Sequence, residues 1–290
     1  MEKKNWKTYL YRTVMGIVFV ILLVYALTLI YPFLWTFINS LKDNAEFYDD
    51  SFGLPKTWRF SNYIEIMDYL RVAKSNPLYY ASFLEMFFNS IWYTAGVAGL
   101  GVLSSAMVGY ALAKYTFPGR NLLYAIAIFV MLIPIVGSLP ALYRFIYNAG
   151  LNNSPLYLVT ATGGLGFNFI ILFGFFRNVS WSYAEAAFVD GASNWTVFLR
   201  IMLPQAMSSI FSLIIIASIG AWNDYLSPLM FLPDFPTVTS GLFSFSVAGA
   251  VRSKPLYFAG ILVSMLPIFL LFVIFQNSIM DNVVAGGLKG

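Results

Sequence analysis

Long stretches without charged residues alternate with polar segments along this chain. Residues 13–41 contain no charged side chain, and five later stretches show the same pattern. A helix of about 20 mostly apolar residues crosses the ~30 Å hydrocarbon core of a bilayer. The pattern therefore predicts six transmembrane helices, at residues 14–38, 87–113, 122–142, 156–176, 206–231 and 258–279.

Two charge-free stretches need separate interpretation. Residues 14–38 follow Lys3, Lys4 and Lys7, as in a signal peptide. Their apolar run is much longer than the roughly 7–15 residues of a signal peptide, so we expect a membrane anchor. Residues 235–251 are short and diluted with Ser, Thr and Gly. They indicate an outer loop or a re-entrant segment.

A polar segment, residues 39–86, separates the first two predicted spans. Asn62 and Glu65 in this segment have the spacing of a capping box, and apolar residues follow at helical spacing. We expect a short amphipathic helix here. It would form either a lid on the outer ends of the spans or a docking surface for an external protein.

A second polar loop, residues 177–204, has the pattern of two helices joined by a glycine. Ser182 and Glu185 again have capping-box spacing, and Gly191 can end the helix that follows. We expect another helix from Ser193 to Leu203–Pro204, because proline resists helix continuation.

The few basic residues of this loop indicate whether it contacts lipid or protein. A helix lying on lipid needs several basic residues along its polar edge, and the second helix offers only Arg200. From the residues alone, a structural connector and a docking element for a protein groove both fit.

Composition supports a chain that lies mostly in lipid. Of its 290 residues, 59% are hydrophobic and 10% are charged, against about 45–50% and 25% in soluble domains. The absence of His and Cys excludes an imidazole base, a thiol nucleophile, a disulfide and the usual zinc or haem ligands. We therefore expect no catalytic, cofactor-binding or metal-ligating residues.

Charge placement predicts the orientation in the membrane. With the N-terminus, the loops 114–120 and 177–204 and the tail inside, nine Lys or Arg and four Asp or Glu lie on the inner side. Eight positive and nine negative residues then lie outside. An excess of Lys and Arg in short loops marks the cytoplasmic side, so both termini are expected to be cytoplasmic.

The segment EAAFVDGASNWTVFLRIMLPQ, residues 185–205, resembles the EAA loop of binding-protein-dependent importer permeases. Its matching positions are Glu185, Ala186, Ala187, Gly191, Ile201, Leu203 and Pro204. FFNS at 87–90, WNDYLSPL at 222–229 and the tail AGGLKG at 285–290 are similar to the maltose and multiple-sugar branch of this family.

This resemblance implies an all-α integral membrane protein with a type I ABC importer permease fold. Its implied partners are a second permease subunit in a heterodimer, a cytosolic ABC ATPase dimer and an external solute-binding protein. Residues 1–86 would form the N-terminal tail, first span and external loop, and residues 87–290 the permease core with the coupling loop 177–204. The residues expected to contact or move with the ATPase are Glu185, Ala186, Ala187, Asp190, Gly191, Ala192, Leu203 and Pro204.

The resemblance also places the chain in a bacterial plasma membrane and assigns ATP to the partner ATPase. The sequence itself lacks the G-x-x-x-x-G-K-[ST] phosphate-binding loop. No cofactor is therefore expected in this chain.

Polar residues within the spans are candidates for the substrate pathway, because burying an unpaired amide in lipid costs free energy. These candidates are Asn89, Asn168, Asn223 and Asp224. The alternative role for each is an interhelical hydrogen bond, and maltose-type importers hold the sugar mainly on the partner permease. Three prolines, Pro134, Pro140 and Pro267, are expected either to kink helices around a pathway or to shape packing.

The expected function is that of a permease subunit of an ATP-driven sugar or oligosaccharide importer, which converts motion of the ATPase into alternating access. One alternative is a permease of the same family for a non-sugar solute. A second is a lipid-modifying membrane enzyme, which the scattered acids and absent histidines oppose. A self-sufficient channel or carrier is a third, and it would transport without any ATPase.

Overall fold

The computed structural model of the chain describes residues 2–76, 78–133, 137–247 and 253–285. Within these ranges the regular structure is helical apart from one short antiparallel pair, β1 (Val72–Ala73) and β2 (Tyr80–Ala81), with Val72 opposite Ala81. Pro134, part of the segment 235–251, Lys289 and most of the tail 285–290 lie outside the described residues.

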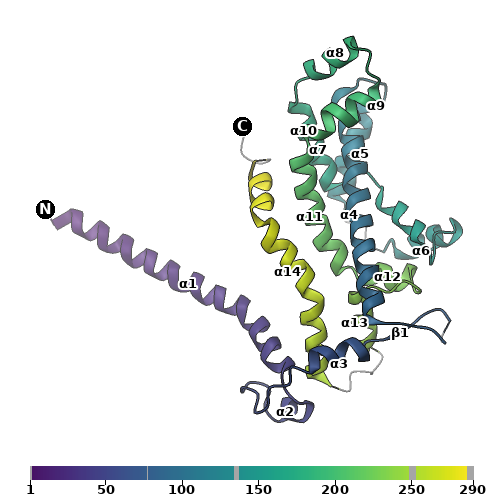
Figure 1. Ribbon diagram of the computed structural model, residues 1–290. Coiled ribbons are helices and arrows are strands. Elements are labelled where there is room, and N and C mark those ends of the chain that lie inside the picture. The colour runs from purple at the N-terminus through teal and green to yellow at the C-terminus, as the bar shows by residue number, and fades with distance from the viewer. Residues whose placement is uncertain (1, 77, 134–136, 248–252, 286–290) are drawn as a thin grey trace. The chain divides into compact units, whose positions relative to one another are not determined.

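The helices shown in Figure 1 follow one another closely along the chain. They are α1 (Glu2–Ser40), α2 (Asn44–Asp49), α3 (Asn62–Tyr69), α4 (Phe83–Lys114), α5 (Arg120–Leu132), α6 (Leu139–Asn148), the 3₁₀ helix η1 (Pro155–Ala161), α7 (Phe167–Asn178), α8 (Ser182–Val189), α9 (Asn194–Val197), the π helix η2 (Phe198–Met202), α10 (Leu203–Gln205), α11 (Met207–Asn223), α12 (Leu226–Phe231), α13 (Val238–Val247) and α14 (Lys254–Ala285).

Packing divides the chain into two compact units, each described here by itself. One contains Met1–Tyr69 and Ala248–Ser264, and the other contains Leu70–Val247 and Met265–Gly290. The family resemblance predicts a different division, into residues 1–86 and a permease core at 87–290. That division stays a prediction.

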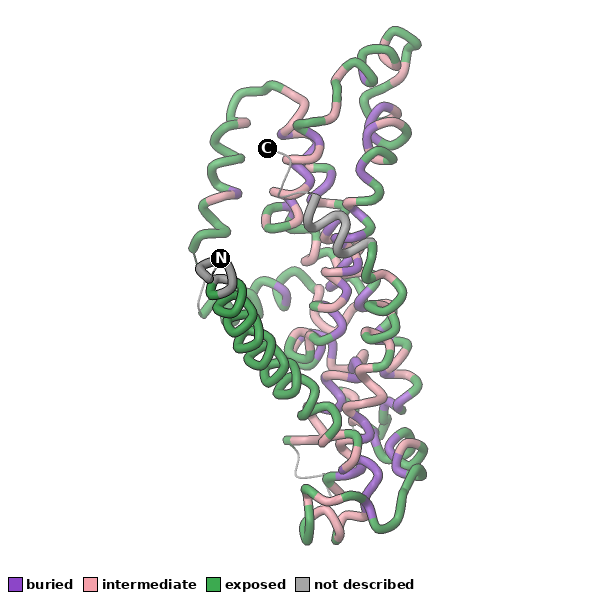
Figure 2. The backbone as a smooth tube through the Cα atoms, turned by 90° about the vertical axis from the view of Figure 1, so that its left-hand side faces the viewer, coloured by how far each residue is buried: buried purple, intermediate pink, exposed green. Residues whose placement is uncertain are grey.

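In the first unit, α1 forms the predicted first span as one continuous helix. Its most apolar 18-residue window has a mean hydropathy of 2.7 and buries none of its surface inside the chain. Figure 2 shows this helix as exposed along most of its length. An apolar surface on all sides fits lipid or another protein rather than water.

Hydrogen bonds hold the end of α1 to the segment that follows it. The Asn62 amide donates to the carbonyls of Ser40 and Lys42 at 2.7 and 3.0 Å. The buried Lys42 ammonium donates to the carbonyl of Asp50 at 2.6 Å. The predicted helix at 62 is present as α3, and Asn62 is its first residue rather than its cap.

The core of the second unit forms where α4 packs against α7 and α11 (Figure 1). Buried residues at this contact include Val102, Tyr110, Leu172 and Ile210. Gly109 permits the close approach of α4 to α7, because an added Cβ would lie 3.1 Å from the backbone nitrogen of Phe173.

Three predicted spans are not single continuous helices. Residues 156–176 hold η1 and α7, separated by a turn in which Gly164 has a φ of 67°. Residues 122–142 cover α5 and the start of α6, whose first turn contains Pro140, so this proline begins a helix instead of kinking one. Residues 206–231 cover α11 and α12, separated at Asp224.

The number of membrane crossings follows only partly from helix length. Three described helices, α1, α4 and α14, are long and apolar enough to cross a bilayer. A fourth results if the run 194–205 and α11, bent by 75°, form one span. The count of six stays a prediction.

The short charge-free stretch 235–251 contains a helix rather than an irregular loop. Within the described part, α13 covers Val238–Val247 and packs against α4. Val238, Gly241 and Leu242 are buried. The packing explains why Ser and Thr in the segment do not prevent a helix, and a re-entrant position stays a prediction.

Candidate functional site

The loop predicted to couple transport contains a tight turn at Gly191. α8 ends at Val189, and Gly191 has a φ of 81°. The Gly191 N–H donates to the Phe188 carbonyl, and the Ala192 N–H donates to the Ala187 carbonyl. This pair of bonds is a Schellman motif, whose left-handed residue is usually glycine. The predicted helix end at Gly191 is therefore confirmed.

The second helix of the loop begins as predicted and ends close to the predicted position. Ser193 caps α9, and its hydroxyl accepts from the Thr196 N–H at 3.2 Å. The helical run continues through η2 and α10 and ends at Gln205, next to the predicted end at Leu203–Pro204. Pro204 lies near the end of this run, where its missing N–H and its ring oppose further continuation of the helix.

One side of the loop packs onto the core of the second unit. Ala184 is fully buried, and Ala187, Phe188 and Ala192 lie against the same cluster. Leu203, at the other end of the loop, also packs against it. Of the predicted coupling residues, Ala187, Ala192 and Leu203 are thus partly covered by their own chain.

The other side of α8 is exposed. Glu185, Ala186 and Asp190 are exposed, and the side chain of Val189 is 87% exposed. Val189 lies one helical turn after Glu185 on the same face of α8 and directly precedes Asp190 in sequence. This face therefore offers a partner an apolar side chain and acidic groups close together.

The capping box predicted at Ser182 and Glu185 is wrong. The cap position of α8 is Trp181, without a side-chain cap, and the Ser182 N–H donates to the Ser180 hydroxyl at 3.3 Å. Within the described residues the Glu185 carboxylate makes no hydrogen bond or ion pair. Its negative charge is therefore available to a partner.

Polar bonds fix the loop to the ends of α4 and α7. The Tyr115 hydroxyl donates to the Asn194 side-chain oxygen at 3.0 Å and lies 3.3 Å from the Tyr110 hydroxyl. The Lys114 ammonium donates to the Val179 carbonyl. These contacts join the start of the loop, at Val179, and the start of its second helix, at Asn194, to the end of α4. The loop and α4 would therefore move together.

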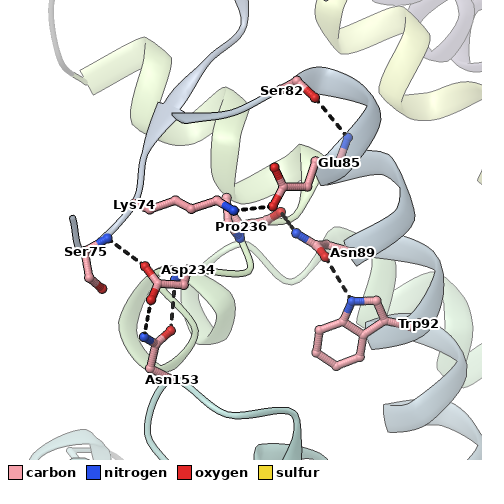
Figure 3. A network of polar contacts seen from close by, with 9 residues as sticks. All are labelled: Lys74, Ser75, Ser82, Glu85, Asn89, Trp92, Asn153, Asp234 and Pro236. Carbon is pink, nitrogen blue, oxygen red and sulfur yellow. Dashed lines mark hydrogen bonds and ion pairs between the residues drawn. The ribbon is translucent and has the colours of Figure 1, made fainter. Parts of the chain in front are cut away.

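At the other end of α4, Asn89 is buried, and both its amide nitrogen and its oxygen form hydrogen bonds within the chain. Its amide nitrogen donates to the Pro236 carbonyl at 3.1 Å, and its oxygen accepts from the Trp92 indole at 3.0 Å. Figure 3 shows both bonds. The geometry supports the alternative role for Asn89, a bond that ties α4 to the segment before α13.

Asp224 is also held by neighbouring residues. Its carboxylate accepts from the Tyr93 hydroxyl at 2.8 Å and from the Ser227 N–H at 3.0 Å. Asn223 beside it is exposed and donates to its own helix at Ile219. Asn168 is half-buried on α7 and makes no side-chain hydrogen bond among the described residues. Among the described residues, no hydrogen bond joins one of the four pathway candidates to another, and their role in a substrate pathway stays a prediction.

A network that the sequence reasoning missed joins three segments of the second unit that are distant in sequence (Figure 3). Asp234 accepts from the Ser75 N–H at 2.7 Å and from the Asn153 amide at 2.6 Å, while its own N–H donates to the Asn153 oxygen at 2.9 Å. These bonds hold the pKa of Asp234 below its ordinary value, the Asn153 bond most strongly. Lys74 and Glu85 pair beside it at 2.5 Å.

The part of the chain that the structure describes holds no group of three or more His, Cys, Asp or Glu side chains placed to bind a metal ion. The described contacts connect α4 to other parts of the chain at both of its ends. One end carries the two-helix loop, and the other end carries the polar network.

Comparison with known proteins relates this chain to permease subunits of transport systems. Residues 101–283 match the family described as "Binding-protein-dependent transport system inner membrane component". The diacetylchitobiose uptake system permease protein NgcG of Streptomyces coelicolor is 30% identical over 277 residues, which cover 92% of this chain and 86% of that protein. The trehalose/maltose transport system permease protein MalG of Thermococcus litoralis is 27% identical, with 91% and 93% covered.

A solved structure shares the fold. A chain of a bacterial ABC transporter involved in the import of the acidic polysaccharide alginate superposes with a TM-score of 0.74 at 24% identity. The match covers 91% of this chain and 96% of that chain.

Proposed function

Because this chain belongs to the family of binding-protein-dependent transport system inner membrane components, we propose that it is a permease subunit that imports a sugar or oligosaccharide. NgcG and MalG, whose names state sugar uptake, support this substrate class. The chain would supply part of the pathway and perform no chemistry of its own. A non-sugar solute is the remaining alternative within the family.

The observation that carries the mechanism is the exposed face of α8. Glu185 has no partner in the described chain, and Val189 is 87% exposed. An ATPase groove that covers Val189 and offers a cation to Glu185 would gain both apolar burial and a charge-assisted bond. Since the loop is tied to α4 by Tyr115 and Lys114, a movement of that groove would pull on α4.

The proposed assembly contains a second permease, a cytosolic ATPase dimer that binds ATP, and an external solute-binding protein. In this assembly the chain lies in a bacterial inner membrane with both termini in the cytoplasm. The coupling residues are those of the predicted set, with Glu185, Ala186, Asp190 and Pro204 exposed to the ATPase. Gly191, Ala187, Ala192 and Leu203 shape the loop.

Uptake by the reconstituted complex tests the function. Proteoliposomes that contain both permeases and the ATPase, with the binding protein added outside, should accumulate a labelled sugar only when ATP is inside. Disaccharides and short oligosaccharides are compared with a polyol and a dipeptide. Accumulation of the polyol or dipeptide alone would refute the sugar assignment, and sugar uptake without ATP would refute the ATP-driven mechanism.

Glu185→Gln tests the coupling contact, because the change removes the charge but keeps the size. We expect less sugar transported per ATP hydrolysed. Glu65→Gln is the matched control, since Glu65 is an exposed carboxylate on α3. In parallel, Val189→Cys should crosslink to the ATPase with a yield that depends on nucleotide. Equal coupling in both Gln variants together with no crosslink would exclude the contact.

A further inference from the structure

A small basic notch opens where α5 begins and α7 ends. It has a volume of about 300 Å³ and is lined by Arg120, Asn121, Tyr124, Phe173 and Arg177. The two arginines come from helices more than 50 positions apart in sequence, and the fold brings both to one cavity. The only charged side chains that line it are positive.

The wall of the notch is aromatic and fixed. The rings of Tyr124 and Phe173 lie with their centroids 4.8 Å apart. Phe173 belongs to a buried cluster with Leu112 and Ala127, which joins α4, α5 and α7. The arginines are therefore presented by packed helices rather than by a loose loop.

Neither arginine is neutralised within the described chain. No ion pair or side-chain hydrogen bond of Arg120 or Arg177 is formed among the described residues. Arg120 is half-buried and Arg177 is exposed. Two guanidinium groups beside one cavity repel each other, and an anion between them would remove that repulsion while receiving bonds in the planar geometry that suits a phosphate.

The notch lies at the border between polar and apolar surface. Arg120 is the first residue of α5, and Arg177 lies in the last turn of α7. Beyond Arg120, α5 exposes Leu122 at 65% and Phe129 at 62%. This combination of a basic cavity and an adjoining apolar helix surface matches the two ends of a phospholipid, whereas free phosphate would use only the first.

We propose that this notch binds the phosphate of an anionic phospholipid from the cytoplasmic leaflet, with the acyl chains lying along α5. The choice of the cytoplasmic leaflet rests on the membrane orientation given under the proposed function. Arg120 and Arg177 hold the phosphate, Asn121 bonds the headgroup, and Tyr124 packs against the glycerol. The bound lipid fills the notch between the start of α5 and the end of α7.

The test compares lipid retained by the whole transporter complex in detergent. The complex is stripped of lipid, supplied with equal amounts of phosphatidylglycerol and phosphatidylcholine, washed, and its bound lipids are quantified. Arg120→Gln/Arg177→Gln should retain less phosphatidylglycerol, by about fivefold for each arginine. The control Arg144→Gln/Arg200→Gln removes the same charge from exposed positions outside the notch and should retain as much as the unmodified complex.

Two further arms separate the possible outcomes. Phosphatidylglycerol should raise the melting temperature of the unmodified complex and of the control, and inorganic phosphate should not. Equal retention by the two double variants would overturn the proposal, as would equal binding of the two lipids or equal protection by inorganic phosphate. If Arg120→Gln/Arg177→Gln does not assemble, Arg120→Lys/Arg177→Lys keeps the charge and is expected to retain an intermediate amount, whereas full retention would contradict the guanidinium geometry. Lipid retention needs no transport, so a failure of the sugar assignment leaves this test intact.

Discussion

At Gly191 the backbone conformation limits which side chain the position accepts. Its φ is 81°, and a Cβ built on it meets no heavy atom of the described chain within 4 Å. Gly191→Val should therefore impair the turn through strain, at a cost of about 1–3 kcal/mol, and reduce sugar uptake while the chain stays in the membrane.

Gly191→Asn is the matched variant, because asparagine tolerates the left-handed region. If strain is the cause, Asn should transport far better than Val in the same proteoliposome assay. If the ATPase occupies the space above Gly191, both variants should fail. Normal transport by the Val variant with the ATPase bound would remove the turn from the coupling mechanism.

Lys42 shows how one buried charged side chain can organise the segment that follows α1. Its side chain is 1% exposed and its ammonium donates to the Asp50 carbonyl at 2.6 Å. Lys42→Met should leave that carbonyl without its donor and cost about 1–3 kcal/mol. Hydrogen exchange over residues 39–69 should rise in this variant. Lys56→Met, at an exposed position, is the control, and equal exchange in both would refute a structural role for Lys42.

At the scale of elements, the bond between Asn153 and Asp234 fixes the segment before α13 to the loop after α6. Asn153→Asp would place two carboxylates where an amide and a carboxylate now bond at 2.6 Å. It should lower the melting temperature of the complex. The exchanged pair Asn153→Asp/Asp234→Asn restores one amide and one carboxylate, so most of the loss should be recovered. A double variant worse than the single one would contradict this pairing.

The same pairing predicts a response to acid. The pKa of Asp234 is lowered from 3.8 in the folded chain, so the bond contributes full stability above that ordinary value. The contribution is lost as the pH falls through the lowered pKa, because the protonated acid no longer accepts both bonds. Asp234→Asn should flatten the loss of melting temperature below about pH 4, measured against the unmodified complex. If the variant loses as much melting temperature below about pH 4 as the unmodified complex, other carboxylates cause the loss.

Helix ends that depend on neighbouring residues could be predicted from the sequence. Hydrogen bonds between residues far apart in the chain could not. Gly191 ended α8 as predicted because a Schellman turn needs only neighbouring residues. Asn62 matched a capping pattern locally, yet its amide bonds to the end of α1, 20 and 22 positions away. The Asn153–Asp234 pair spans 81 positions, and no periodicity in the chain indicates such a contact. The EAA resemblance located the exposed loop, whereas the role of each residue in coupling stays a prediction.

At the scale of the whole molecule, the position of the second unit across the membrane can be tested with two cysteines. The sequence has no Cys. Leu78, in the β1–β2 hairpin, is 83% exposed, and Val189, at the end of α8, is 87% exposed. In Figure 1 the hairpin and α8 lie at opposite ends of α4.

Leu78→Cys should react with an impermeant maleimide added to intact cells, and Val189→Cys should react only after the membrane is opened. Lys289→Cys, in the tail, should behave like Val189→Cys if both termini are cytoplasmic. The reverse pattern would invert the orientation and place the coupling loop away from any cytosolic ATPase.

The helix α1 has a consequence for how the protein is made. Its apolar window buries none of its surface in the chain, while the corresponding window of α4 is 39% buried. As the nascent chain leaves the ribosome, α1 emerges before α4 and the later helices, and it can enter the bilayer on its own hydrophobicity. The inserted helix α1 then has no protein contacts yet. It anchors the chain in the membrane while the later helices are synthesised.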